Sequence, residues 1–433
     1  DQPRSRGLGD VYKRQIDRYH MKFLNVIFKG HSISELIQEV IYVFIGYFFL
    51  MISYCTPRNK KKWVFGNKKI FKDNTKYLFI YMQEQHPEIQ TIWITSSRRL
   101  VKRLRALSYS AYYKYSLKGL YHSLTAGVYV STVNSNHINF FTSGRVFNVN
   151  LWHGISLKAM VDNKAIPADR SFLSRVCMPY AYEQYGLFFS TTPTIDEQYL
   201  RFFRFDPQVL YHGMSPRCSF MMMDHERLLR YIEEKEDPLM LDIIHTSRKY
   251  NKVFVYMPTW RINYGTHFMD YAFPDLYALN KAFSKINAIL LLKLHPSMKY
   301  DTFKYKDLKH IYYIDANIDL YPILPFTDIM ISDYSSIWYD YLLLPNKGVI
   351  HYDFDVNSYA KNEFGFFRDY KTFTPGVHAS DFKQLLATIE SSSSLQISEE
   401  RRTWILDEMW GKGRSTNNED LIKEICKRVE QVL

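Results

Sequence analysis

The chain has 433 residues, of which 46% are hydrophobic and 23% charged, with only 17 Gly and 16 Pro. This composition excludes disordered, collagen-like and low-complexity proteins and indicates a folded chain of two or three domains. A formal charge of +12, together with 35 Tyr and 30 Phe, favours an anionic or membranous partner. The four cysteines form no C-x-x-C pair, which predicts neither a disulfide framework nor a cysteine zinc site and fits a reducing compartment.

The first part of the chain divides into a leader and an apolar segment. Residues 1–20 lack apolar periodicity and resemble a non-native cloning remnant, with Met21 as the expected start. Residues 40–55 carry no charge and precede Arg58 and three lysines at 60–62. As a helix they would span roughly 24 Å, short of the roughly 30 Å hydrocarbon core. We therefore predict a membrane-associated helical segment over 21–58, either a marginal span or an interfacial anchor on the cytoplasmic side; the alternative is a buried core helix.

Short apolar runs alternate with amphipathic stretches over the rest of the chain. This alternation predicts parallel-sheet units and, in sum, an α/β protein with two Rossmann-type doubly wound lobes facing a cleft. The lobes are expected over 59–240 and 241–395, followed by C-terminal helices over 396–433. The strands predicted in the first lobe include 91–95, 127–131 and 146–151, and those in the second are 253–257, 288–294, 311–314, 329–332 and 348–352.

Polar side chains follow several of these strands directly, at the edge where open parallel sheets bind ligands. His153 follows the strand that ends at 151, Arg261 follows 253–257, and His295 follows 288–294. A Ser-Asp-Tyr-Ser-Ser run at 332–336 passes from strand to predicted helix, with Asp333 or Ser335 as the expected N-cap. Free N–H groups and hydroxyls at a helix start suit phosphate, and so does the forked guanidinium of Arg261; a plain capping motif and a surface ion pair are the alternatives.

The two histidines are the candidates for proton transfer. His153 lies between Trp152 and Gly154, where a missing side chain lets a substrate approach, and a histidine with a pKa near its ordinary value of about 6.5 can accept a hydroxyl proton. We predict that His153 is the general base. His295 is expected to contact phosphate or protonate the leaving group, with a satisfied buried histidine as the alternative.

Other chemistries have weaker signals. The chain lacks P-loop, dinucleotide-binding, hydrolase-elbow and zincin motifs. The D-x-D at Asp353 and Asp355 matches a metal-binding motif of nucleotide-sugar transferases but is more often an ordinary loop. The basic and aromatic side chains between Lys102 and Tyr115 suit nucleic-acid stacking, although a solvated helix face near a membrane is favoured.

Taken in order, the motifs resemble the CDP-glycerol glycerophosphotransferase family, which makes teichoic acids and some capsular polymers. The resemblance runs from about residue 61 to about 429 and implies a GT-B-like fold with the cytidine nucleotide on the C-terminal lobe. One motif departs from the family pattern, because the segment at 213–219 has an extra residue and no Asp after Arg217. The matching stretches are KKWVFGNKKIFKDNTKYLF (61–79), LWHGISLKAMVD (151–162), YMPTWR (256–261), LLKLHP (291–296) and ISDYSSIWYDYLLLPNK (331–347).

The resemblance also implies roles for individual residues. His153 would be the base, and its neighbours would shape the site around it. The implied substrate-binding residues are Trp152, Gly154, Ile155, Ser156, Arg217, Pro258, Thr259, Arg261, Lys293, Leu294, Ser335, Ser336 and Asp340, with His295 as the second catalytic residue.

The predicted reaction transfers glycerol phosphate, or a related polyol phosphate, from CDP-glycerol to a hydroxyl of a prenyl-linked or polymeric acceptor at the membrane, releasing CMP. No cofactor and no essential divalent metal are expected, and nucleic acid is not an expected partner. The alternatives are a GT-B glycosyltransferase that uses a nucleotide sugar and a noncatalytic membrane-bound binder of polyanions. The sequence does not separate glycerol from ribitol donors, or a primase from a polymerase.

Overall fold

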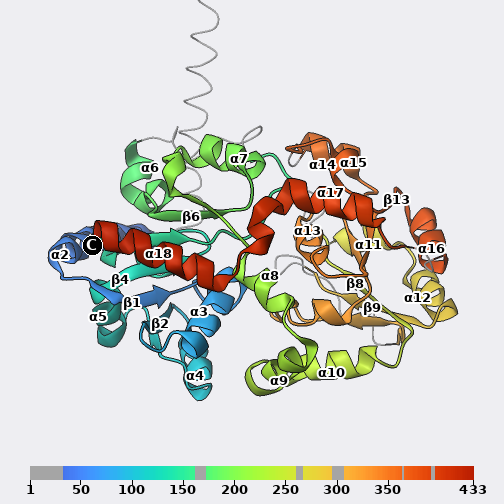
Figure 1. The fold of residues 1–433 in the computed structure, drawn as a ribbon, viewed down its shortest axis with the longest axis horizontal. Coiled ribbons are helices and arrows are strands. Elements are labelled where there is room, and N and C mark those ends of the chain that lie inside the picture. The colour runs from blue at the N-terminus through green and yellow to red at the C-terminus, as the bar shows by residue number, and fades with distance from the viewer. Residues whose placement is uncertain (1–32, 161–171, 260–266, 295–306, 363–364, 392–394) are drawn as a thin grey trace, which may run out of the picture.

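The computed structural model describes residues 33–160, 172–259, 267–294, 307–362, 365–391 and 395–433. Two parallel sheets form the centres of two α/β lobes that lie side by side (Figure 1). The first has the order β3-β2-β1-β4-β5-β6-β7 and the second the order β10-β9-β8-β11-β12-β13. Every pair of neighbouring strands is parallel, which confirms the predicted α/β class with parallel sheets.

The strands are short and mostly buried, as expected for sheets covered by helices on both faces. Those of the first sheet are β1 (Asn59–Phe65), β2 (Gln90–Thr95), β3 (Ala111–Tyr113), β4 (Ala126–Ser131), β5 (Phe147–Asn150), β6 (Leu187–Ser190) and β7 (Leu210–His212). Those of the second are β8 (Lys252–Tyr256), β9 (Ala288–Leu292), β10 (Ile311–Tyr313), β11 (Ile329–Ser332), β12 (Gly348–Tyr352) and β13 (Val377–Ala379).

Helices connect the strands and cover the sheets. The first lobe contains α3 (Asp73–Gln85), α4 (Arg98–Ala106), α5 (Leu117–Thr125), α6 (Phe172–Cys177), α7 (Pro193–Phe203) and α8 (Pro216–Met221), and α9 (His225–Lys235) and α10 (Pro238–Ser247) lead into the second. The second lobe contains α11 (Phe268–Ala272), α12 (Leu276–Lys285), α13 (Ile337–Tyr341), α14 (Val356–Asn362), α15 (Tyr370–Phe373) and α16 (Phe382–Glu390).

The C-terminal helices connect the lobes. In α17 (Glu399–Trp410), the Trp410 ring N–H donates to the Tyr339 carbonyl of the second lobe, while the Glu408 carbonyl accepts from Thr192 of the first. The chain then returns to the first sheet as α18 (Asn418–Val432), coloured red in Figure 1. There the Arg428 guanidinium donates to backbone carbonyls around β6 and β7. The domain limits predicted at 240 and 395 stay predictions.

The N-terminal helix α2 (Ile33–Cys55) packs one face on the first lobe. The Tyr47 hydroxyl donates to the Val176 carbonyl at 2.9 Å, and the Ser53 hydroxyl accepts from the Gly144 N–H at 2.9 Å. Other α2 side chains face solvent, among them Phe44 at 74% and Phe48 at 58% exposure. Within the described residues, no helix combines the length and the apolar character that crossing a bilayer requires.

Two cations of the basic flank of α2 contact the first lobe. The Arg58 guanidinium turns inward and donates to the carbonyls of Ser123, Ala126 and Thr142. The Lys62 side chain is buried and donates to the Thr125 hydroxyl at 2.9 Å. These two cations therefore have partners within the protein, which the local charge density of the sequence does not reveal.

Candidate active site

The loop after β5 carries the predicted base. Trp152 and Gly154 both have positive φ values, +47° and +129°, so the backbone turns sharply on either side of His153. A Cβ atom at Gly154 would lie 2.5 Å from Arg217 Nη2. Glycine is therefore required there both by the backbone conformation and by the close approach of the guanidinium. The Trp152 ring packs against His153, with ring centroids 4.1 Å apart.

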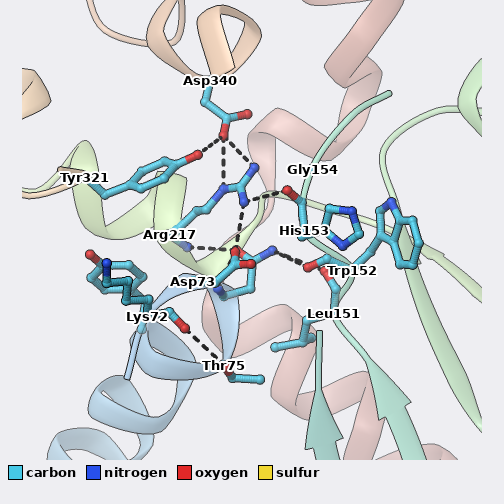
Figure 2. A network of polar contacts seen from close by, with 12 residues as sticks. Lys72, Asp73, Thr75, Leu151, Trp152, His153, Gly154, Arg217, Tyr321 and Asp340 are labelled. Atoms are coloured by element: carbon cyan, nitrogen blue, oxygen red, sulfur yellow. Dashed lines mark hydrogen bonds and ion pairs between the residues drawn. The ribbon is translucent and has the colours of Figure 1, made fainter. Parts of the chain in front are cut away.

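Arg217, at the start of α8, holds this loop in place (Figure 2). Its Nη1 donates to the His153 carbonyl at 2.7 Å and to Asp73 Oδ1 at 2.8 Å. Its Nε and Nη2 donate to Asp340 Oδ2 of the second lobe, at 3.0 and 2.7 Å. One buried guanidinium thus connects α3, the His153 loop and α13 of the second lobe.

The charges in this network compensate one another. Burial alone would disfavour the Arg217 cation, but Asp340, Tyr321 and Asp73 together hold its pKa well above the usual value. Asp340 is fully buried, and its Oδ2 also accepts from the Tyr321 hydroxyl at 2.6 Å. Its Oδ1 accepts no hydrogen bond from the residues that the structure describes. Direct contact of Arg217 or Asp340 with a substrate stays a prediction.

Two residues at the start of α3 complete the support, and the sequence reasoning did not single them out. Asp73 receives the Arg217 contact described above, and its own backbone has a positive φ of 69°. The Asn74 amide donates to the carbonyls of Leu151 and Trp152, at 3.1 and 3.0 Å, and its Oδ1 accepts from the Arg217 N–H at 3.2 Å. Both residues lie inside the quoted stretch at 61–79, but only the fold brings them to the β5 loop.

The surroundings of His153 favour its neutral form. Its side chain is open to solvent, although protein atoms surround it closely enough to lower its pKa below the ordinary value of 6.5. Asp73 opposes this effect and Arg217 adds to it. A lowered pKa leaves the imidazole mainly neutral at pH 7, so a ring nitrogen can accept a proton.

The remaining first-lobe candidates line the same loop. The Gly154 carbonyl accepts from the Tyr199 hydroxyl at 3.2 Å, and the Ser156 carbonyl accepts from the Gln198 amide at 3.1 Å. The Ile155 side chain is buried, and the Ser156 hydroxyl donates to the Lys158 carbonyl at 2.8 Å. Their local bonds fix the loop conformation, and their contact with substrate is untested.

In the second lobe, Asp333 ties two strand ends together. Its carboxylate accepts from the Thr259 N–H at 2.8 Å and from the Ser335 N–H at 3.2 Å. The prediction that Asp333 or Ser335 caps the following helix was wrong, because Ser336 occupies the N-cap of α13 and its side chain makes no capping bond. Ser335 and Ser336 are half-buried, whereas Pro258, Thr259 and Leu294 are buried.

Lysines from both lobes meet at their junction. Lys293, just after β9, and Lys72, just before α3, each place Nζ 3.1 Å from the Ala316 carbonyl. Burial and the neighbouring Lys72 lower the pKa of Lys293 to about 8, while Asp319 and Asp315 oppose the shift. Two cations close to the β9 end suit a diphosphate donor. His295 and Arg261 lie outside the described residues.

The residues of the D-x-D motif and part of the basic and aromatic stretch contact other side chains of the protein. Asp353 Oδ2 lies 2.7 Å from His378 Nδ1, and Asp355 accepts from the Tyr334 hydroxyl at 2.8 Å, which favours a loop over a metal site. Across the described ranges, no group of three or more His, Cys, Asp or Glu side chains is arranged to hold a metal. The guanidinium of Arg105 stacks on the ring of Tyr112, so part of the basic and aromatic stretch pairs within the protein. The absence of a metal requirement remains a prediction.

Two α/β lobes, each built on a parallel sheet and joined beside the His153 loop, form a GT-B-like architecture. The sequence profile of the CDP-glycerol:poly(glycerophosphate) glycerophosphotransferases matches residues 48–426. The chain therefore belongs to this family and is a glycerophosphotransferase, which confirms the enzyme class predicted from its motifs.

Individual relatives agree with this assignment. A teichoic acid poly(glycerol phosphate) polymerase of Bacillus spizizenii is 24% identical over 419 residues, covering 92% of this chain and 98% of that protein. The ribitol-phosphate polymerase TarL of Staphylococcus aureus is 30% identical over 179 residues, but the match covers only 41% of this chain and 30% of TarL. A solved structure of the wall teichoic acid polymerase TagF has a TM-score of 0.70 at 17% identity, covering 93% of this chain and 100% of that chain. Its similarity supports the fold.

Proposed function

We propose that this glycerophosphotransferase extends a membrane-linked acceptor by transferring glycerol phosphate from CDP-glycerol, in teichoic acid or capsular polymer synthesis. The observation that carries the proposal is the placement of His153, which a buried Arg217 network holds at the junction of the two lobes. The poly(glycerol phosphate) polymerase of B. spizizenii, which this chain matches over nearly its full length, supports a glycerol donor. The ribitol-phosphate polymerase matches a shorter part, so a ribitol donor is the second candidate.

In the proposed reaction, neutral His153 accepts the proton of an acceptor hydroxyl. The hydroxyl oxygen attacks the β-phosphorus of CDP-glycerol, a new P–O bond forms, and the P–O bond to CMP breaks with its electron pair on the departing phosphate. Phosphoryl transfer depends mainly on positioning the reactants and on stabilising negative charge. The Arg217 network would position His153. Lys293 and Lys72 would stabilise the negative charge of the phosphates. The family resemblance implies donor-site roles for four further residues, namely Ser335, Ser336, Arg261 and His295.

The outer face of α2 supports a peripheral position on the membrane. Phe44, Phe48, Met51 and Tyr54 are all more than half exposed on this helix. Aromatic and apolar side chains on one face of a helix partition into the interfacial layer of a bilayer. We propose that α2 lies on the cytoplasmic leaflet, which would keep the enzyme beside a lipid-linked acceptor.

The test compares wild-type protein with His153→Ala. Both are incubated with CDP-glycerol, CDP-ribitol or nucleotide sugars, together with a prenyl-linked acceptor, and the release of CMP, UDP or UMP is measured. We expect acceptor-dependent CMP release that falls by at least about a hundredfold in the variant, because general base catalysis contributes on this scale. His245→Ala, an exposed histidine on α10, is the matched control and should retain full activity. Full activity in His153→Ala would remove the base assignment, and sugar-nucleotide turnover would favour a glycosyltransferase.

A further inference from the structure

The C-terminal edge of the first sheet carries several basic side chains. Lys68 follows β1, Lys114 follows β3, and His137 lies in the loop after β4. We call Lys68, Lys114 and His137 the basic edge. Because these strands are parallel, their carboxyl ends share one side of the sheet with the His153 loop after β5. His153 is close enough to affect the charge state of His137.

Lys114 is the buried member of the basic edge. It is 6% exposed, and its Nζ donates to the Asn136 carbonyl at 3.1 Å and to Asn136 Oδ1 at 3.3 Å. Its ammonium forms no ion pair with a carboxylate in the described part of the chain, and neither does that of the exposed Lys68. Burial and then Lys68 lower the pKa of Lys114 to about 8, and no acidic group opposes the shift. At pH 7 about 90% of the side chains would still carry the proton.

The pKa of His137 is lowered by the same lysines. Its Nδ1 lies 3.1 Å from Asn67 Oδ1. Burial, Lys68, Lys114 and His153 all lower its pKa, to about 4, so the ring is neutral at pH 7. The titratable groups that act on it are therefore all bases. A buried cation without a counter-charge is costly, and a bound anion would remove that cost.

We propose that the basic edge binds a phosphate group of the acceptor, namely the phosphodiester one polyol unit behind the hydroxyl that His153 deprotonates. The inference rests on the proposed function, because it assumes an acceptor chain built from polyol phosphate units. In such a chain the terminal hydroxyl and the preceding phosphate are separated by a single polyol. An anchor for that phosphate beside His153 would hold the hydroxyl in reach of the base.

The geometry also separates this subsite from the donor site. Lys72 lies in the same β1–α3 loop as Lys68 but, like Lys293, contacts the Ala316 carbonyl of the second lobe, whereas Lys114 contacts Asn136 of the first lobe. Substitutions on the basic edge should therefore weaken binding of the acceptor and leave binding of CDP-glycerol unchanged. A residue that merely supports the fold would not produce this difference between the two substrates.

The experiment uses Lys68→Gln, Lys114→Gln and the control Lys281→Gln, an exposed lysine on α12 that makes no ion pair in the described chain. A short glycerol phosphate oligomer serves as the acceptor, and an uncharged polyol of similar length as its comparison. We expect the KM for the oligomer to rise at least about tenfold in each edge variant, the loss expected for a hydrogen bond to a charged group. The KM for CDP-glycerol and the turnover of the uncharged polyol should remain within twofold. Because Lys68 is exposed, its variant tests the proposal even if Lys114→Gln folds poorly.

Binding of the same oligomer in the absence of CDP-glycerol, measured by calorimetry, gives a readout that does not need catalysis. Weaker binding in both edge variants, with wild-type affinity in Lys281→Gln, is the expected result. Equal affinity in wild type and Lys68→Gln, or a loss of kcat with both KM values unchanged, would overturn the phosphate subsite. A wild-type protein that binds the oligomer through Lys68 but turns over no CDP-linked donor would contradict the proposed function and leave the subsite standing.

Discussion

Buried cations at the lobe junction have carboxylate partners, whereas the buried lysine of the basic edge has none in the described part of the chain. At the junction, Lys76 contacts Glu236 and lies 3.1 Å from Asp319, while Arg217 contacts both Asp340 and Asp73. At the basic edge, the Lys114 ammonium donates to the side-chain and backbone oxygens of Asn136 and lies 5.5 Å from the centre of the Tyr115 ring, with no carboxylate partner in the described part of the chain. Compensated cations hold the two lobes in one arrangement, whereas an uncompensated cation leaves binding energy for an anionic substrate. The following changes test this difference.

The largest effect is expected from breaking the compensated network with Arg217→Met. The substitution leaves Asp340 buried without its cation, which costs about 3 kcal/mol or more of stability. It also releases the His153 carbonyl, so CMP release should fall along with the unfolding midpoint in urea. The control is Arg227→Met, whose exposed ion pair with Glu84 at 3.3 Å should contribute less than about 1 kcal/mol. An Arg217→Met protein as stable as wild type would show that the network does not hold the lobes together.

A gentler change to the same network separates positioning from stability. In Gly154→Ala the new Cβ would lie 2.5 Å from Arg217 Nη2, at a φ of +129° that alanine rarely adopts. Displacing the His153 loop should lower kcat by about a hundredfold, the scale of a misplacement of about 1 Å. The KM for CDP-glycerol should change little, because the donor is expected on the second lobe. Gly365→Ala is the matched control, since its nearest neighbour would be the Ala159 Cβ at 3.9 Å; equal kcat losses in both variants would refute the positioning role.

Lys114, which has no carboxylate partner in the described chain, should make the stability of the protein depend on pH. The folded pKa of Lys114, about 8, is below its ordinary value of 10.5, so the unfolded chain binds more protons between these pH values. Stability should therefore rise as pH increases from about 8 to about 10.5, by on the order of 3 kcal/mol from this group. The charged group that acts on Lys114 over this range is Lys68, because His137, with a pKa of about 4, is already neutral.

Replacing this lysine tests the sign directly. In Lys114→Met, the free energy of unfolding measured by urea titration should not show that rise. The stability of the wild type relative to the variant should therefore increase between about pH 8 and about 10.5. Lys281→Met should reproduce the wild-type profile. A wild-type stability that is flat between pH 8 and 10.5, or that matches the slope of Lys114→Met, would mean that Lys114 is compensated after all.

The placement of His153 could be predicted from the sequence, because an apolar run followed by a polar motif locates a strand end, and parallel strands gather such ends at one edge. Its supports could not be predicted in this way. Arg217 meets Asp340 and Asp73 across 123 and 144 residues, and no local pattern encodes those contacts. The same limit applies to charge compensation. In the sequence, Lys72 directly precedes a helix and Lys114 directly follows a strand, and nothing local distinguishes their surroundings. The fold places Asp319 and Asp315 near Lys72 but no acidic group near Lys114.

The smallest expected effect extends the comparison to the flank of α2. The two terminal nitrogens of Arg58 donate to backbone carbonyls, whereas Lys61 is exposed and makes no ion pair within the described chain. If α2 rests on an anionic leaflet, Lys61→Gln should weaken co-sedimentation with vesicles of 30% phosphatidylserine by about fivefold, since one lysine near such a surface contributes about 1 kcal/mol. Arg58→Gln should leave vesicle affinity within twofold and lower the unfolding midpoint, because its carbonyl partners are left unsatisfied. Equal losses of vesicle binding in the two variants would place Arg58 among the lipid-facing cations and contradict the distinction between satisfied and available charge.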